Sequence, residues 1–131
     1  MRTALSVLLI AVGMFPVAAP ASAHHSFAAE FDANKPITLE GTITKVAWVN
    51  PHSWLYIEVK DTDGTVVEWA FQTVSPTSLF KRGWRKDSLP VGTPVTVQGF
   101  LAKDGSATAN AQTVILPDGT ELFAGPSPGS R

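Results

Sequence analysis

Apolar and polar residues alternate along most of the chain, and Gly, Pro and Asp stand where the alternation stops. In residues 54–60, for example, Leu55, Ile57 and Val59 share one phase, while Trp54 and Tyr56 share the other. A period of two is typical of a β-strand with one buried face. The pattern predicts five strands, at residues 37–48, 54–60, 66–71, 95–102 and 108–116, and a short hairpin arm at 121–124.

The first predicted strand changes phase along its length. Residues 37–43 place apolar side chains or Gly at every second position, but Val46 and Trp48 fall in the opposite phase. A phase change within a strand indicates a β-bulge, and Gly41 can help the strand to bend there. A strand that bends in this way can pair with a neighbour on each side.

A short helix is predicted between the third and fourth strands. Ser75 followed by Pro76 is typical of a helix N-cap and first turn. The helix would span residues 77–82, and Gly83 suits the position just after its end. Three strands, a short helix and two strands form the order expected of an all-β, five-stranded OB-fold-like Greek-key barrel. An open β-sandwich is the alternative. The predicted core contains Leu55, Ile57, Val67, Trp69, Val95 and Val97.

Residues 1–23 have the three parts of a cleavable secretory signal peptide. Arg2 supplies the positive start, residues 5–12 the apolar run, and Ala21-Ser22-Ala23 the small-residue cleavage site. The apolar run is too short for a comfortable membrane span, which needs about 20 residues. We therefore expect a periplasmic or secreted protein with no transmembrane segment after cleavage. Its predicted parts are an N-terminal arm at residues 24–36, the barrel at 37–124 and a disordered tail at 125–131.

The composition of the mature chain narrows its chemistry. Cleavage leaves about 108 of the 131 residues, and the loss of Arg2 moves the formal charge from −1 to −2. A chain with this charge lacks the basic surface that nucleic acid requires. Cysteine is absent, and both methionines, Met1 and Met14, lie in the predicted signal peptide. A soft thiolate or thioether site for Cu(I) is therefore excluded in the mature protein.

Three stretches stand out as motifs: His24-His25-Ser26-Phe27, Trp48-Val49-Asn50-Pro51-His52, and Gly83-Trp84-Arg85-Lys86-Asp87-Ser88-Leu89. In combination they resemble a family of small exported bacterial proteins that is classed only as a domain of unknown function. The resemblance covers the mature chain from His24 to about Phe123. It implies export and a compact β domain, and it implies no established activity.

All three histidines lie at the predicted mature start or in one loop. Cleavage after Ala23 gives His24 a free α-amino group beside its imidazole, a pair that chelates metals, and His25 or His52 could add a third nitrogen. Cleavage after Ala21 instead leaves Ser22-Ala23-His24, whose amine, amides and imidazole suit the square plane of Cu(II). The histidines thus predict a site for Cu(II) or another divalent transition metal. The alternative is that the terminal histidines are solvent-exposed and bind nothing, and that His52 simply lies in a turn and hydrogen-bonds to backbone.

Aromatic side chains provide a second candidate site. Trp54 and Tyr56 fall on the predicted outer face, near the surface where OB-folds bind oligonucleotides and oligosaccharides, and Asn50 lies in the adjoining loop. The alternative is that Phe27 and Phe31 of the arm cover this face, since an exposed apolar patch promotes aggregation.

Four basic residues cluster at the predicted helix C-terminus, where positive charge complements the helix dipole. A solvated helix end explains them, and contact with an anionic lipid or polyanion is the alternative. The cluster consists of Lys81, Arg82, Arg85 and Lys86.

No arrangement of residues indicates catalysis. The carboxylates are scattered, and Ser26 and Ser53 adjoin histidines in sequence only, which does not make a nucleophile. The sequence therefore favours a binding module for a metal, a small ligand or a periplasmic protein. An enzyme would require a bound metal with an open coordination position.

The first prediction concerns processing. Because Ala21-Ser22-Ala23 matches the cleavage pattern, protein recovered from the periplasm should begin at His24, with Ser22 as the minor start. Intact-mass measurement of the periplasmic fraction tests this, and a full-length cytosolic species would contradict it.

Overall fold

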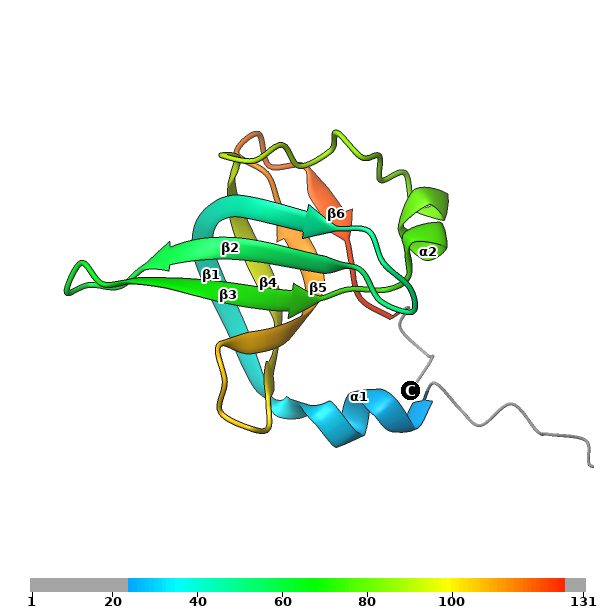
Figure 1. Cartoon of the computed structure of the whole chain (residues 1–131), viewed down its shortest axis with the longest axis horizontal. Helices are drawn as coiled ribbons and strands as arrows, with labels where there is room; N and C mark the ends of the chain where they lie inside the picture. The colour runs from blue at the N-terminus through cyan, green and yellow to red at the C-terminus, as the bar shows by residue number, and fades with distance from the viewer. Residues whose placement is uncertain (1–23, 127–131) are drawn as a thin grey trace, which may run out of the picture.

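The computed structural model describes residues 24–126, and it describes side chains from Phe27 onward. The predicted signal peptide, residues 127–131 of the predicted tail, and the side chains of His24 and His25 lie outside the described part. Two helices and six strands make up the fold (Figure 1). In chain order they are α1 (His24–Glu30), β1 (Phe31–Ala47), β2 (Trp54–Lys60), β3 (Val66–Gln72), α2 (Pro76–Lys81), β4 (Pro94–Ala102), β5 (Thr108–Ile115) and β6 (Glu121–Phe123).

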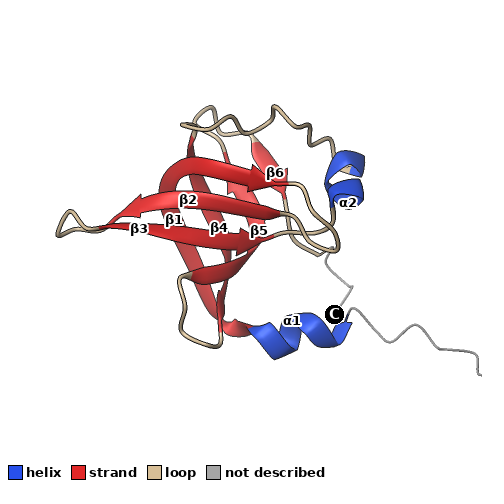
Figure 2. Ribbon diagram, viewed as in Figure 1, coloured by secondary structure: helices blue, strands red, loops and turns tan. Residues whose placement is uncertain are grey.

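One parallel pairing closes the sheet into a barrel. The strands follow the order β3-β2-β1-β4-β5-β6, with antiparallel neighbours throughout, and β3 also pairs in parallel with β5 (Figure 2). Ala70, Phe71 and Gln72 lie opposite Thr108, Ala109 and Asn110. The predicted fold class, a small all-β barrel with one short helix between the third and fourth strands, is confirmed. The open β-sandwich is not formed, because β3 and β5 complete the ring.

The bend predicted in the first strand is present. The early part of β1 pairs with β4 and the later part pairs with β2. The register with β2 slips between Ile43 and Lys45, so Thr44 is the extra residue of a bulge. At Gly41, a Cβ atom would lie only 2.5 Å from the carbonyl oxygen of Glu58. Glycine therefore allows the backbones of β1 and β2 to approach closely at the point where the pairing of β1 changes from β4 to β2.

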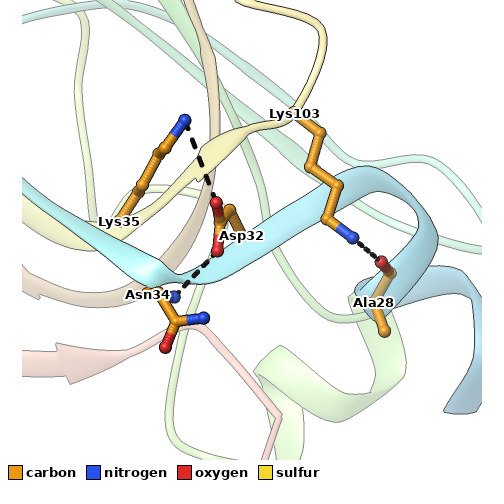
Figure 3. A network of polar contacts seen from close by, with 5 residues as sticks. All are labelled: Ala28, Asp32, Asn34, Lys35 and Lys103. Atoms are coloured by element: carbon orange, nitrogen blue, oxygen red, sulfur yellow. Dashed lines mark hydrogen bonds and ion pairs between the residues drawn. The ribbon is translucent and has the colours of Figure 1, made fainter.

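The first strand begins earlier than the predicted residue 37. Residues 24–36 form α1 and then the start of β1 rather than a plain arm, and Phe31 pairs with Ala102. The alternation of apolar and polar residues does not reveal this start, because residues 32–35 are mostly polar and exposed. Asp32 accepts a hydrogen bond from the Asn34 backbone at 3.0 Å, and its carboxylate lies 3.9 Å from the Lys35 ammonium (Figure 3).

The core forms inside the barrel much as the alternation predicts. Leu55, Ile57 and Val97 are fully buried, and Val95 is 5% exposed. Val67 and Trp69 of β3 are only partly buried, and Trp69 packs against the edge of the core. Residues outside the strands complete the core, namely Leu79 of α2, Trp84 and Leu89.

The helix α2 begins and ends as its sequence indicates, one residue earlier than predicted. The Ser75 hydroxyl accepts a hydrogen bond from the Ser78 N–H at 3.3 Å, and Pro76 occupies the first turn. Gly83 adopts a φ of +91°, which favours glycine at the end of a helix. Neither helix in residues 24–126 has the length and apolar character needed to cross a lipid bilayer.

Three hairpin turns share one local arrangement, Asp followed by Gly and then Thr or Ser. A carboxylate oxygen accepts the N–H two residues later, from Thr65 to Asp63 at 2.8 Å and from Thr120 to Asp118 at 2.8 Å. Asp104 accepts both the hydroxyl and the N–H of Ser106. These bonds favour the charged carboxylate, so they lower the pKa of each of the three aspartates.

The second prediction tests the strand phase. Ile57→Ala should lower the free energy of unfolding by about 2–5 kcal/mol, because it leaves a cavity in the barrel. Val66→Ala, at a residue 55% exposed, is the control and should change it by less than about 0.5 kcal/mol. Urea unfolding measures both. A negligible change for Ile57→Ala would mean that the phase of β2 is inverted.

The third prediction follows from the turn aspartates. A lowered native pKa stabilises the fold above the ordinary aspartate pKa of about 3.9, and that stabilisation disappears as pH falls through the native value. Changing Asp63, Asp104 and Asp118 together to Asn should therefore flatten the acid side of the stability–pH curve. Urea midpoints between pH 2 and 6 measure this. An unchanged acid slope would show that these turns do not couple protonation to folding.

Candidate functional site

His52 lies in the loop between β1 and β2, and its ring is held by the neighbouring strand end. The Nδ1 atom lies 3.1 Å from the carbonyl oxygen of Thr73, just after β3. A carbonyl oxygen only accepts, so Nδ1 carries the proton and donates. The neutral imidazole therefore has its lone pair on Nε2, which has no hydrogen-bond partner among the described residues.

A compact polar network fixes the backbone on both sides of this contact. The Thr73 N–H and hydroxyl both donate to the Ser53 carbonyl, at 2.9 and 3.1 Å, and the Ser53 N–H donates to the Val74 carbonyl at 3.1 Å. Ser53 and Thr73 are fully buried or nearly so. The Ser53 hydroxyl is buried without a hydrogen-bond partner in the described part of the chain. The network holds the loop, and with it the half-buried His52, in one position.

The N-terminal helix reaches the same strand end. The Gln72 amide donates to the Glu30 carboxylate at 3.5 Å, one residue before Thr73. The Lys103 N–H donates to the Glu30 carbonyl at 2.9 Å, and the Lys103 ammonium donates to the Ala28 carbonyl (Figure 3). The end of α1 is thereby attached both to the β4–β5 hairpin and to β3.

The predicted metal ligands are only partly described by the structure. His24 and His25 begin α1, whose seven residues span about 10 Å. In the view of Figure 1, the starting end of α1 points toward the side on which the β1–β2 loop lies. Their side chains lie outside the described part, so their approach to His52 stays a prediction. Among the described side chains, no group of three His, Asp or Glu residues is placed to hold a metal ion.

The aromatic face of β2 is half-buried, and the arm does not cover it. Trp54 and Tyr56 lie on the side opposite Leu55 and Ile57, as predicted, and Asn50 is exposed in the adjoining loop. The Lys45 ammonium lies 5.4 Å from the centre of the Tyr56 ring, a cation–π distance.

The expectation that Phe27 and Phe31 cover this face is wrong. The Phe27 ring packs against Phe31 at 5.6 Å and against Phe100 of β4 at 5.9 Å between ring centres. The reason is the pairing of Phe31 with Ala102, which directs the arm to β4 instead of β2.

A second aromatic group gathers around α2, and the strand analysis missed it. Trp48 and Phe80 stack with their planes 4° apart and their centres 5.0 Å apart, and the edge of Trp84 meets Trp48 at 6.4 Å. Beside them lies a shallow hollow of about 440 Å³, lined by Thr77, Phe80, Lys81 and Arg85. The only sequence signal for this group was the basic cluster, because Trp48 and Phe80 are far apart along the chain.

The fold and its sites define a small β-barrel that presents one tethered imidazole and one basic, aromatic hollow. The chain belongs to a family of unknown function, DUF6152, whose sequence model matches residues 12–111. That span contains all three of the motifs on which the resemblance was noted. No curated protein matches the chain. No solved structure matches it either.

Proposed function

We propose that this protein is an exported periplasmic module that binds a divalent transition metal, Cu(II) foremost, through His52, His24 and His25. The observation that carries the proposal is the contact between His52 Nδ1 and the Thr73 carbonyl. Metal-binding histidines commonly donate their second ring N–H to a carbonyl or carboxylate, which fixes the tautomer and orients the ligand nitrogen. His52 has this arrangement, and its Nε2 is the nitrogen left for a metal.

The position of α1 supports the rest of the ligand set. Glu30, at the end of α1, is hydrogen-bonded to Gln72, and the next residue, Thr73, holds His52. His24 and His25 therefore lie only the length of the seven-residue helix away from this end of β3. A free amine at His24 would add a nitrogen ligand to the imidazoles. Nitrogen ligands suit Cu(II), and residues 24–131 contain no sulfur that would favour Cu(I).

A second candidate function is ligand or protein binding on the outer face of β2. It is favoured by one observation: the Phe27 ring packs on Phe100, while Trp54 and Tyr56 are only half-buried. Aromatic rings of this kind stack on sugars or bases and also fill protein interfaces. This function needs no metal, so it does not depend on His52.

The fourth prediction is that Cu(II) binding depends on both His52 and the free amine. In calorimetric titration with glycine as competitor, protein beginning at His24 should bind more tightly than the same chain with a retained methionine. His52→Ala should weaken binding by about tenfold or more, since loss of even a supporting residue costs about 10–100-fold. Binding should also weaken as pH falls, because protons compete with the metal for the nitrogen ligands.

Two matched variants serve as controls for that titration. Tyr56→Ala lies on the other candidate surface and should leave Cu(II) affinity unchanged. Ser53→Ala changes the residue next to His52 and removes a hydroxyl without a partner, so it should also bind normally. If His52→Ala binds like the parent protein, the folded three-histidine site is wrong. If the blocked amine has no effect, the terminal chelate is wrong.

A further inference from the structure

The hollow beside α2 has a rigid apolar wall. Phe80 is 37% exposed, and one face of its ring stacks on Trp48. Trp48 is in turn supported by Trp84, which is 1% exposed and donates its indole N–H to the Phe123 carbonyl at 3.1 Å. The chain of contacts from Phe80 to the core holds the ring in place while part of it faces solvent.

The basic side chains around this wall have N–H donors that are not used in hydrogen bonds within the described part of the chain. Arg85 uses Nη1 to donate to the carbonyls of Phe80 and Trp84, at 3.2 and 2.7 Å, which positions its guanidinium. The N–H groups on the other two guanidinium nitrogens of Arg85 have no partner among the described residues. The same holds for the Lys81 ammonium and the Thr77 hydroxyl. No described carboxylate pairs with either cation.

The local charge favours an anion. Residues 81–87 contain four basic residues and one acidic residue, in a chain whose formal charge is −1. Arg and Lys donors, together with the Thr77 hydroxyl that also lines the hollow, suit a tetrahedral oxyanion such as phosphate. An inorganic ion would leave the Phe80 ring uncovered, so the complementary ligand also has an apolar part.

We propose that this hollow binds a phosphate ester whose other end is apolar. Lys81, Arg85 and Thr77 hold the phosphate oxygens, and Phe80 packs against the body of the ester. A soluble aryl or alkyl phosphate and the headgroup region of an anionic phospholipid share this chemistry. The site is separate from His52 and does not depend on bound metal.

The fifth prediction is tested by NMR titration of the mature protein with three probes. These are phenyl phosphate, inorganic phosphate and dihexanoyl phosphatidylglycerol below its micelle concentration. Phenyl phosphate or the short-chain lipid should bind more tightly than inorganic phosphate and shift the signals of Phe80 and Lys81. Whichever organic probe binds more tightly identifies the source of the ester. Affinity should fall as salt is raised, because the cations are exposed.

Substitutions separate the two halves of the site. Lys81→Gln and Arg85→Gln should each weaken phenyl phosphate binding by about tenfold, the loss expected for one charge-assisted hydrogen bond. Lys60→Gln removes another exposed lysine, on β2, and should have no effect. Phe80→Ala should remove the preference for phenyl phosphate over inorganic phosphate, and Phe80→Leu, which keeps an apolar packing partner for Trp48, should retain part of it.

The outcomes decide the proposal in both directions. The proposal would be overturned if neither organic probe bound more tightly than inorganic phosphate. It would also be overturned by normal binding in a Lys81→Gln variant with unchanged thermal unfolding. Absence of binding by all three probes would overturn it as well. Loss of binding in Lys81→Gln and Arg85→Gln but not in Lys60→Gln would support it.

Discussion

The parallel pairing of β3 with β5 is the interaction on which the rest of the structure depends. It joins Ala70, Phe71 and Gln72 to Thr108, Ala109 and Asn110, and two further bonds extend it, from the Ala70 N–H to the Ala107 carbonyl and from the Asn110 amide to the Gln72 carbonyl. Without it, β3 would be an edge strand with unpaired backbone groups. With it, the barrel closes and the end of β3 is placed against the rest of the molecule.

The segment that follows this pairing connects nearly every feature of chemical interest. Gln72 binds Glu30 of the N-terminal helix, and Thr73 binds His52. The Val74 N–H donates to the Ala124 carbonyl at 2.9 Å, and Ser75 is the N-cap of α2. Four consecutive residues therefore hold the arm, the His52 loop, the end of the β6 segment and the helix that carries the basic hollow. A metal site and an anion site on either side of this segment would share one rigid support while using different side chains.

Local pattern accounts for much of the fold. The alternation at Leu55 and Ile57 identified the buried face of β2, and the phase change after Ile43 located the bulge. Both are visible in sequence because side chains alternate across a strand. The early start of β1 at Phe31 was not visible, because exposed polar residues follow it and its pairing partner, Ala102, is distant in sequence. The stacking of Trp48 on Phe80 was also not visible, because the two residues are distant in sequence.

The sequence by itself determined most of the strands, the turns, the helix cap and the kinds of ligand atoms that residues 24–131 can offer. These depend on period-two alternation, on Asp and Gly in tight turns, and on the absence of sulfur after residue 23, all of which are local or compositional. Only the tertiary structure decided which nitrogen of His52 is left for a ligand, where the arm packs, and which ring supports Phe80. His52 and Thr73 are 21 residues apart, and the antiparallel pairing of β2 with β3 brings them together. Gln72 and Glu30 are 42 residues apart, and they meet only in the closed barrel.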